Sequence, residues 1–458
     1  MSVMGIDIGT TTISVIMMDD ETGKLLDSLT IPHKSFLKGY PAYSKVQDPQ
    51  VIWKLTEQAA AELISRNGVP KCIGMTGQMH GFLYVDQKGE AVSPLYTWQD
   101  GSGNEFLPDG RTSVEILQSA AGSAASGYGL ITHYYLQKKG LVPENARKMV
   151  TISDYIAMKL CGGCDPFIAG DMAASWGCFD LELGDFCRQE LEEQELDLSV
   201  LPEILSGHPV VGVTSGVFPK NIPVIASLGD NQASVIGSVK DLSNTVLINI
   251  GTGSQVSFGT ERYVDAHGSI ELRPCTGKHF LMVGSGLCGG RAYAMLEKFY
   301  REVSGTEDSK EMYRRMEQQA REFMDAYGKE AAWKIRTAFS GTRSNPGERG
   351  SISSISVENF YPGAMTLGML QGILGELKEM YGEMCSITGT KAANLVGSGN
   401  GLRRNALMRE LAGDIFHMPV KIPVCTEEAA YGAALQALVS AGFEDSLEEA
   451  QRKIQYES

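Results

Sequence analysis

The chain contains no apolar run of about 18 residues, the minimum for a helix that crosses a bilayer, so we expect no membrane span. Its N-terminus lacks a basic region ahead of a short apolar stretch, which argues against a signal peptide. Basic residues are in deficit, with 40 Lys and Arg against 55 Asp and Glu and a net charge of −15. A nucleic-acid surface needs clustered Lys and Arg, so we expect no nucleic-acid partner. We therefore expect a cytoplasmic protein whose nine cysteines stay reduced.

Several short catalytic motifs are also missing. The sequence contains no P-loop (GxxxxGKS or GxxxxGKT), no GxSxG and no HExxH, so P-loop nucleotidases, serine hydrolases and zinc peptidases lack their main signal. Cys161 and Cys164 form a CxxC pair, but no second pair follows at the spacing of a zinc site. A glycine turn between two thiols is therefore preferred to a metal or redox site.

The sequence does contain a repeated pattern of strand, Gly/Thr turn and strand. Val3 to Ile8 and Ile13 to Met18 are apolar runs on either side of the first turn. Roughly half a chain later, Thr245 to Ile250 leads through a second Gly/Thr turn into Gln255 to Phe258. With a length of 458 residues, the pattern predicts two α/β domains, at 1–240 and 241–458, related by a weak internal duplication.

Caps and apolar spacing predict further elements. Asp48 is expected to cap a helix that Pro49 opens and that runs to Asn67. An alanine-rich helix at 427–441 should pack closely against another element. The remaining expected elements are strands at 71–76, 223–228 and 393–396 and helices at 231–239, 291–302 and 310–327.

The two Gly/Thr turns are candidate phosphate sites, because a tight turn directs backbone N–H groups and hydroxyls toward one point. Asp7 ends a strand just before the first turn, where a carboxylate can hold hydrated Mg²⁺. Taken alone, the first turn is equally well explained as an exposed hairpin. Two such turns, one in each half, can grip one polyphosphate when the domains close. The candidate phosphate-binding residues are Gly9, Thr10, Thr11, Thr12, Gly251, Thr252, Gly253 and Ser254.

Two other glycine-rich stretches have weaker interpretations. Gly397 to Gly401 follows a predicted strand and could let an adenine ring approach the backbone, although an ordinary strand-to-helix turn explains it better when it is taken alone. Gly284 to Gly289 matches the dinucleotide fingerprint GxGxxG. It lies mid-chain, however, and no strand clearly ends at an acidic residue about 20 residues further on. An NAD site is therefore disfavoured.

Asp230 lies between a predicted buried strand and a predicted helix. An Asp at this point can be a helix cap. The end of a strand in an α/β sheet also faces the usual ligand crevice, and phosphoryl transfer uses an Asp to accept the proton of the attacking hydroxyl. Both roles are compatible with the position.

Polar and aromatic residues in the first half suit a polyol. Gln78 and His80 follow a predicted buried strand and are flanked by glycines that allow close approach, although a lone His is more often structural. Trp98 and Asp100 add a ring and an acid, the usual partners of sugar faces and hydroxyls.

Together, these stretches resemble the FGGY carbohydrate kinases over nearly the whole chain, from Gly5 to Ala434. The resemblance implies an α/β fold of two actin-like (ribonuclease H-like) domains, as in actin, Hsp70 and hexokinase, with a cleft between them. It implies ATP and Mg²⁺ as cofactors, with Asp7 assisting the metal and Asp230 as the catalytic base. The implied sugar site consists of Gln78, Met79, His80, Asp100 and Asn231, and Trp98 would cover one sugar face. The implied adenosine contacts are Gly399, Asn400 and Asn405.

Within the family, the chain most resembles the kinases of sedoheptulose, through Thr97 to Asp100, Gly127 to Gly129 and the stretch 341–351. This resemblance implies phosphorylation of a free ketose at its terminal hydroxyl, giving sedoheptulose 7-phosphate. Gly101 to Gly103 stand where many members carry an arginine, and 338–346 replaces a Pro-Tyr-rich stretch of the pentulose kinases. The alternatives are a kinase of xylulose, ribulose, fructose or glycerol, and a catalytically silent actin-like sugar sensor. The sequence leaves open whether the chain forms a homodimer.

Overall fold

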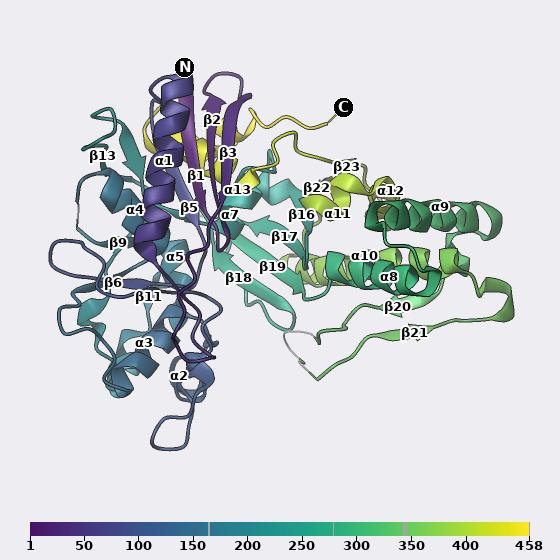
Figure 1. The fold of residues 1–458 in the computed structure, drawn as a ribbon, viewed down its shortest axis with the longest axis horizontal. Coiled ribbons are helices and arrows are strands. Elements are labelled where there is room, and N and C mark those ends of the chain that lie inside the picture. Colours follow the sequence, from purple (N-terminus) through teal and green to yellow (C-terminus); the bar gives the residue numbers. More distant parts are fainter. Residues whose placement is uncertain (164, 278, 342–344, 346, 458) are drawn as a thin grey trace. The chain divides into compact units, whose positions relative to one another are not determined.

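The computed structural model describes residues 1–163, 165–277, 279–341, 345 and 347–457 (Figure 1). These residues divide into two compact units. The first contains Met1–Lys240, Arg273–Lys278 and Cys425–Gln455, and the second contains Asp241–Leu272, His279–Val424 and Tyr456–Ser458. A single division at residue 240 therefore differs from the structure, because two later segments return to the first unit.

The first unit is built on a mixed sheet. Strands β1 (Ser2–Ile8) and β2 (Thr12–Asp19) form an antiparallel hairpin, which β3 (Leu25–Pro32) extends. Strand β5 (Ile73–Gly77) lies parallel to β1, with Asp7 opposite Thr76. Beyond β5 the sheet continues through β14 (Pro223–Ile225) and β13 (Val210–Val213), and the short β15 (Leu228–Gly229) also pairs with β5.

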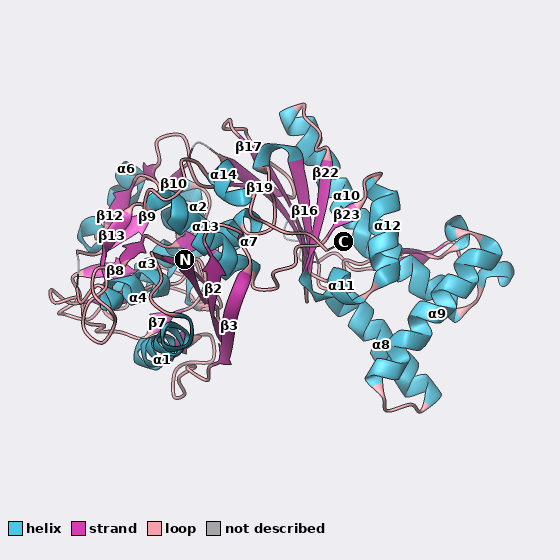
Figure 2. Cartoon of the chain, turned by 90° about the horizontal axis from the view of Figure 1, so that it is seen from above, coloured by secondary structure: helices cyan, strands magenta, loops and turns pink. Residues whose placement is uncertain are grey.

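The second unit repeats this topology. Strands β16 (Thr245–Ile250) and β17 (Ser254–Thr260) form an antiparallel hairpin, and β22 (Asn394–Ser398) lies parallel to β16. These strands lie side by side in Figure 2, with β19 (Phe280–Gly286) antiparallel to β17. β18 (Ile270–Pro274) and β23 (Val420–Lys421) stand at the sheet's edges. The predicted duplication is therefore present as one strand–turn–strand motif, with a later parallel strand, in each unit.

The predicted helices are present with small shifts at their ends. α1 (Pro49–Asn67) begins as expected, with the Asp48 side chain accepting a hydrogen bond from Gln50 N at 2.8 Å. The other helices that bear on the site are α4 (Ile152–Leu160), α5 (Gly170–Ala174), α7 (Asp230–Ile236), α8 (Gly290–Ser304), α9 (Ser309–Tyr327), α10 (Pro362–Thr388), α11 (Gly399–Arg404), α12 (Ala406–Phe416) and α13 (Glu428–Ser440).

Helix α13 joins the first unit although it lies near the end of the sequence. In Figure 1 it is the yellow helix beside the purple strand β1, and it packs on β1 and β5. A Cβ added to Gly5 would lie 1.9 Å from Ala430 O, and one added to Gly74 would lie 1.9 Å from Ala433 O. Only glycine fits at this distance, so the close packing expected of the alanine-rich helix is confirmed.

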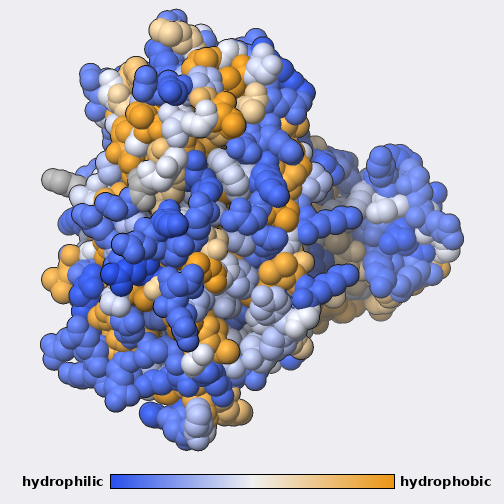
Figure 3. All heavy atoms as spheres, turned by 60° about the vertical axis from the view of Figure 1, so that its left-hand side comes forward, coloured by the Kyte–Doolittle hydropathy of each residue, from blue (hydrophilic) through white to orange (hydrophobic). Residues whose placement is uncertain are grey.

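Separate hydrophobic cores support the two units. In the first, one core lies between the β1–β5 sheet and its helices, and another gathers around Phe82, Tyr84 and Trp176. In the second, α8, α9, α10 and α12 cover the sheet through one core. On the face drawn in Figure 3, apolar side chains are scattered among hydrophilic ones, which by itself marks no interface. No helix in the described ranges is long and apolar enough to cross a membrane.

Candidate active site

The first Gly/Thr turn, Gly9 to Thr12, connects β1 to β2, and its carbonyl groups are bound by the surrounding protein. The Gly9 carbonyl accepts from His33 Nε2 at 3.0 Å, and the Thr10 carbonyl accepts from Gln47 Nε2 at 2.7 Å. The Thr11 carbonyl accepts from His33 N at 2.8 Å. Gly9 N donates to Thr12 O at 2.9 Å within the turn, so the candidate anion-binding groups are the other amides and the hydroxyls of the turn.

The second turn is held in the same manner by the start of α8. Gly290 N donates to Gly251 O at 3.0 Å, and Arg291 N donates to Thr252 O at 2.9 Å. Gly251 N donates to Gly253 O at 3.0 Å. Both predicted phosphate turns therefore share one construction, in which the carbonyl oxygens accept bonds within their own unit.

The GxGxxG stretch has a packing role beside this second turn. A Cβ on Gly286 would lie 2.5 Å from Ser254 Oγ, and a Cβ on Gly289 would lie 2.5 Å from Gly253 O. The strand that carries the motif, β19, runs antiparallel to β17, whereas a dinucleotide fingerprint opens a parallel βαβ unit. These glycines fit α8 against the turn, which explains the motif without NAD.

The charges of two other carboxylates of the first unit act on Asp7. Asp7 lies in β1, Asp230 opens α7, and Glu427 precedes α13. Burial raises the pKa of Asp7 to about 7, and the negative charges of Asp230 and Glu427 add to the effect. Burial also raises the pKa of Asp230 to about 6, opposed by the Asn231 N–H and by Arg273. An Asp230 carboxyl with a pKa near 6 is suited to accept a proton close to neutral pH.

Asp7 fits a magnesium site of the kind used with nucleotides. Its Oδ1 is buried and has no hydrogen-bond partner in the described part of the chain. In that same part, no group of three or more His, Cys, Asp or Glu side chains could enclose a metal. Mg²⁺ commonly uses only one or two carboxylates, together with water and substrate phosphates. The donor set therefore fits Mg²⁺ that arrives with a nucleotide and does not fit a cage made of protein alone.

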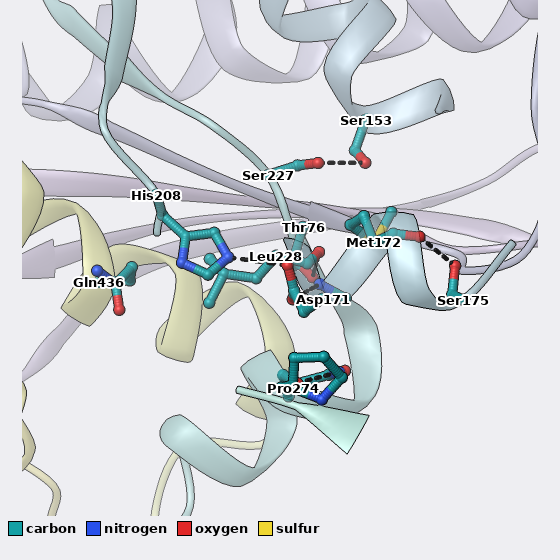
Figure 4. A network of polar contacts seen from close by, with 12 residues as sticks. Thr76, Ser153, Asp171, Met172, Ser175, His208, Ser227, Leu228, Pro274 and Gln436 are labelled. Carbon is teal, nitrogen blue, oxygen red and sulfur yellow. Dashed lines mark hydrogen bonds and ion pairs between the residues drawn. The ribbon is translucent and has the colours of Figure 1, made fainter. Parts of the chain in front are cut away.

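Asp230 follows a strand segment in which each residue is held by a different element (Figure 4). Ser227 Oγ donates to Asp154 Oδ1 of α4 at 2.6 Å, and Leu228 O accepts from Thr76 Oγ1 of β5 at 2.9 Å. Gly229 N donates to Asp171 Oδ2 of α5 at 2.9 Å.

Asp171 is itself oriented by His208, whose Nε2 lies 3.1 Å from Asp171 Oδ1, and both side chains are buried. These contacts fix the backbone on which Asp230 is placed. Asp154, Asp171 and His208 did not figure in the sequence analysis, because no spacing in the sequence links them to Asp230.

The predicted sugar residue His80 follows β5 in the first unit. Its φ of 71° is unusual for a residue other than glycine, and its ring stacks on Tyr128 with centroids 4.5 Å apart. His80 Nδ1 donates to Ser175 O at 2.6 Å, so Nε2 is the acceptor nitrogen of the neutral ring. Asn231 Oδ1 accepts from Arg273 Nη1 at 3.4 Å. Strained backbone of this kind is often found at ligand sites.

Gln78 and Trp98 connect the predicted sugar residues with the first turn. Gln78 Nε2 donates to Gln47 Oε1 at 3.1 Å, and Gln47 in turn holds the Thr10 carbonyl. Gln78 Oε1 is buried and has no hydrogen-bond partner among residues that the structure describes. Trp98 is 47% exposed, and its Nε1 donates to Thr10 Oγ1 at 3.0 Å.

The positions of Asp100 and Met79 are those of residues that support the fold. Asp100 is 2% exposed, and its carboxylate accepts from Ser44 Oγ, Lys45 N and Ser102 N at 3.0, 3.2 and 3.0 Å. It therefore fixes the loop around residue 44. Met79 is 4% exposed and belongs to the aromatic core of the first unit.

The predicted adenosine residues lie at helix starts in the second unit. The expected turn at Gly397 to Gly401 is instead the end of β22 followed directly by α11. Gly399 has a φ of 80°, and a Cβ there would lie 2.6 Å from Ile250 O, which brings α11 close to β16. Asn400 is exposed, whereas Asn405 caps α12 by accepting from Met408 N at 2.8 Å.

Two other sequence features fall partly outside the described residues. Cys164 is not described, so the CxxC pair has no structural account, and the described cysteines are free thiols. Thr342 and Arg343, part of the stretch that resembles the sedoheptulose kinases, also lie outside the described ranges.

Comparison with known proteins identifies the same architecture. Sedoheptulokinase of Mus musculus is 29% identical over 95% of this chain and 97% of its own length. The crystal structure of xylulose kinase from Rhodospirillum rubrum superposes with a TM-score of 0.86 at 18% identity, covering 100% of this chain and 93% of that one. The structure of Plasmodium falciparum glycerol kinase with ADP gives a TM-score of 0.82 at 19% identity over 100% and 93% of the two chains. The predicted actin-like two-domain α/β fold is therefore confirmed.

Family matching covers both halves of the chain. Residues 2–237 match the N-terminal domain of the FGGY family of carbohydrate kinases, and residues 246–441 match the C-terminal domain of the same family. The chain belongs to the FGGY family of carbohydrate kinases and is a sugar phosphotransferase.

Proposed function

We propose that this kinase transfers the γ-phosphoryl group of ATP to the terminal hydroxyl of a free ketose, with sedoheptulose as the substrate and sedoheptulose 7-phosphate as the product. The observation that carries the proposal is the state of three predicted site residues. Asp7 Oδ1, Gln78 Oε1 and Ser254 Oγ are buried polar atoms without hydrogen-bond partners within the described ranges. Such atoms are rare in native proteins and call for an explanation, and a bound ligand supplies one.

In the proposed reaction, Asp230 is the general base. Its carboxylate accepts the proton of the ketose hydroxyl as that oxygen forms a bond to the γ-phosphorus, while the bond from the γ-phosphorus to the bridging oxygen breaks and ADP leaves. Burial raises the pKa of Asp230 to about 6, which still leaves the carboxyl mostly ionised at neutral pH. We therefore expect kcat/KM to fall as the pH is lowered through about 6.

The cofactor assignment follows from the turns and from Asp7. Gly9 to Thr12 and Gly251 to Ser254 bind phosphate oxygens through amides and hydroxyls, and Gly399, Asn400 and Asn405 are assigned to the adenosine. Asp7 would hold Mg²⁺, which would supply neutralisation of charge on the phosphates. In this assignment, residues 1–240 carry the predicted sugar residues, the first turn and the base, and 241–458 carry the second turn and the adenosine site. The known complex of a glycerol kinase with ADP supports nucleotide binding by this fold.

The substrate assignment has two supports. Gln78, His80 and Asn231 are uncharged hydrogen-bonding groups, which suit the hydroxyls of a free sugar. The similarity to mouse sedoheptulokinase extends over 97% of that enzyme, so no large part of it lacks a counterpart here.

A competition assay tests the substrate. Equal concentrations of sedoheptulose, xylulose, ribulose, fructose and glycerol are supplied with ATP and Mg²⁺, and the products are separated by mass. We expect sedoheptulose phosphate to dominate. Dominance of another product would replace sedoheptulose while leaving the kinase assignment intact, and binding of ATP without any sugar phosphate would favour a silent sugar sensor.

The Asp230→Asn variant tests the base. Asp230 is the first residue of α7, after the N-cap Gly229, and no side-chain capping bond is made there, so this change removes the proton acceptor without removing a cap. We expect kcat to fall by about 10²–10⁴ while ATP still binds. Asp241→Asn makes the same substitution at the start of another short helix and is the control, which should leave kcat unchanged. Near wild-type turnover by Asp230→Asn would rule out the assignment.

A further inference from the structure

Arg273 lies near the end of β18, at the point where the chain passes from the second unit into the first. Two contacts with the first turn of α7 place this part of the chain. Gln232 Nε2 donates to the carbonyl of Pro274 at 2.9 Å, and Arg273 Nη1 lies 3.4 Å from Asn231 Oδ1 (Pro274 is labelled in Figure 4). The side chain of Arg273 is therefore brought to the helix that begins with the proposed base.

The surroundings of Arg273 include both parts of the proposed sugar site. Its charge is coupled to Asp230 on α7 and to Tyr128, whose ring stacks on His80. Burial lowers the pKa of the guanidinium, but Arg remains protonated at neutral pH because its ordinary pKa lies above about 12. A permanent cation thus accompanies His80 and Asn231.

The position of the reacting hydroxyl decides which substrate atoms Arg273 can reach. A hydroxyl that gives its proton to Asp230 must lie within hydrogen-bond reach of that carboxylate. The next hydroxyl along a ketose is only one carbon away, so it is presented to the groups beside Asp230, which are Asn231 and Arg273. A guanidinium offers several donors in a fixed plane and can hold such an oxygen in one orientation.

We propose that Arg273 is a specificity-determining residue of the sugar site, whose guanidinium donates to the hydroxyl on the carbon next to the phosphorylated one. The inference rests on the proposed function through the role of Asp230. This contact restricts the substrates to polyols that carry a hydroxyl at the penultimate carbon, in the configuration that lets it contact Arg273 and Asn231. Asn231 accepts from Arg273 and so orients the guanidinium toward the substrate.

A cycle that combines one enzyme variant with one substrate change tests the contact. kcat/KM is measured for wild type and Arg273→Met with sedoheptulose and with its 6-deoxy analogue, which lacks the penultimate hydroxyl. Removing either partner should lower kcat/KM by about 10- to 100-fold, the range of a hydrogen bond to a charged group. Removing the second partner should then cost little more, because the contact is already lost. If the variant and the substrate change lowered kcat/KM independently, so that the two losses multiplied, the proposal would be overturned.

Two further variants separate this role from folding. Arg273→Lys keeps the charge but loses the planar fork, and it should fall between wild type and Arg273→Met. Arg262→Met removes an exposed arginine that follows β17 and should leave kcat/KM unchanged. KM for ATP should stay at the wild-type value in all three. A rise in KM for ATP with Arg273→Met, at unchanged KM for the ketose, would assign Arg273 to the phosphates and overturn the proposal.

The failure of the proposed function has a different signature. If another ketose is phosphorylated, the cycle uses that ketose and its analogue without the penultimate hydroxyl. If none is phosphorylated, the proposed function fails, and the cycle is measured on sedoheptulose binding by calorimetry. Additive losses in binding, or no binding by the wild type, would then overturn the role of Arg273 as well.

Discussion

Trp98 donates its indole N–H to Thr10 Oγ1 at 3.0 Å, and this bond joins a residue assigned to the sugar with a residue assigned to phosphate. The two residues are 88 positions apart in the chain. Because Trp98 is 47% exposed, its ring faces solvent on one side while the indole nitrogen is held. A substitution at either residue should therefore also affect the position of the other.

This relationship predicts coupled losses in Trp98→Phe and Thr10→Val. Each variant removes one hydrogen bond worth about 0.5–1.5 kcal/mol, so kcat/KM for the ketose should fall about 2- to 10-fold. The double variant should be scarcely worse than the poorer single variant, because the same bond is lost in each case. Steady-state kinetics on the four enzymes measures the coupling, and fully multiplicative losses would contradict it.

The two phosphate turns could be predicted because their signal is local. Gly and Thr follow directly after an apolar strand in both halves, and the chain need only fold back on itself. The side chains that hold the first turn could not be predicted in this way. His33 lies 24 residues from Gly9, and Gln47 lies 37 residues from Thr10, and nothing in their own neighbourhoods indicates a partner.

Similar limits apply to the rest of the fold and site. The cap at Asp48 was predictable from two adjacent residues, and the close packing of α13 was predictable from its alanines. The partners of α13, Gly5 and Gly74, lie in strands hundreds of residues earlier, so only the tertiary structure identifies them. Asp100 was expected at the sugar because its type and its neighbour Trp98 suit a polyol, but its environment is that of a buried loop anchor.

Asp7→Asn should change the pH dependence of stability. The pKa of Asp7 in the folded protein is raised to about 7 from an ordinary value of 3.8. The folded protein therefore holds this proton more tightly than the unfolded chain does. The stability that this gives is complete at pH values below 3.8 and is lost as the pH rises through 7. Asn cannot ionise, so the variant does not lose this stability as the pH rises. The Tm of the variant, relative to wild type, should therefore be higher at pH 8 than at pH 5, by roughly 2–4 °C for each kcal/mol involved.

Thermal unfolding without nucleotide at the two pH values measures this effect. The same variant should lose most of its kinase activity, because the carboxylate assigned to Mg²⁺ is gone. If the variant and the wild type differed in Tm by the same amount at both pH values, the pKa of Asp7 would not be raised in the folded protein.

Asp171→Ala should destabilise the protein strongly, because it removes the partner of buried His208 and the acceptor of Gly229 N. Breaking a buried pair costs about 3–5 kcal/mol. Asp185→Ala is the matched control, since Asp185 pairs with Arg188 at the surface and such pairs contribute about 0–1 kcal/mol. Urea unfolding compares the two, and similar losses would contradict the role of Asp171. If Asp171→Ala folds, its kcat should also fall, because the strand that carries Asp230 is no longer fixed.

Gly289→Ala should disturb the second phosphate turn and leave the sugar site unchanged. The Cβ of this alanine would lie 2.5 Å from Gly253 O, and backbone on that side must move. Overpacking of this kind costs about 1–3 kcal/mol, which corresponds to a loss of roughly 5- to 100-fold in ATP affinity if it falls on the turn.

Gly375→Ala is the control for this change, because it adds the same methyl group in the interior of α10, where nothing lies within 4 Å of the new Cβ. Replacing a helical glycine by alanine stabilises by about 0.5–1 kcal/mol, so this variant should bind ATP normally and unfold at a slightly higher temperature. Calorimetric titration with ATP distinguishes the two variants. Wild-type ATP affinity in Gly289→Ala would mean that Gly251 to Ser254 does not hold the phosphates, since the methyl group cannot be accommodated without moving that turn.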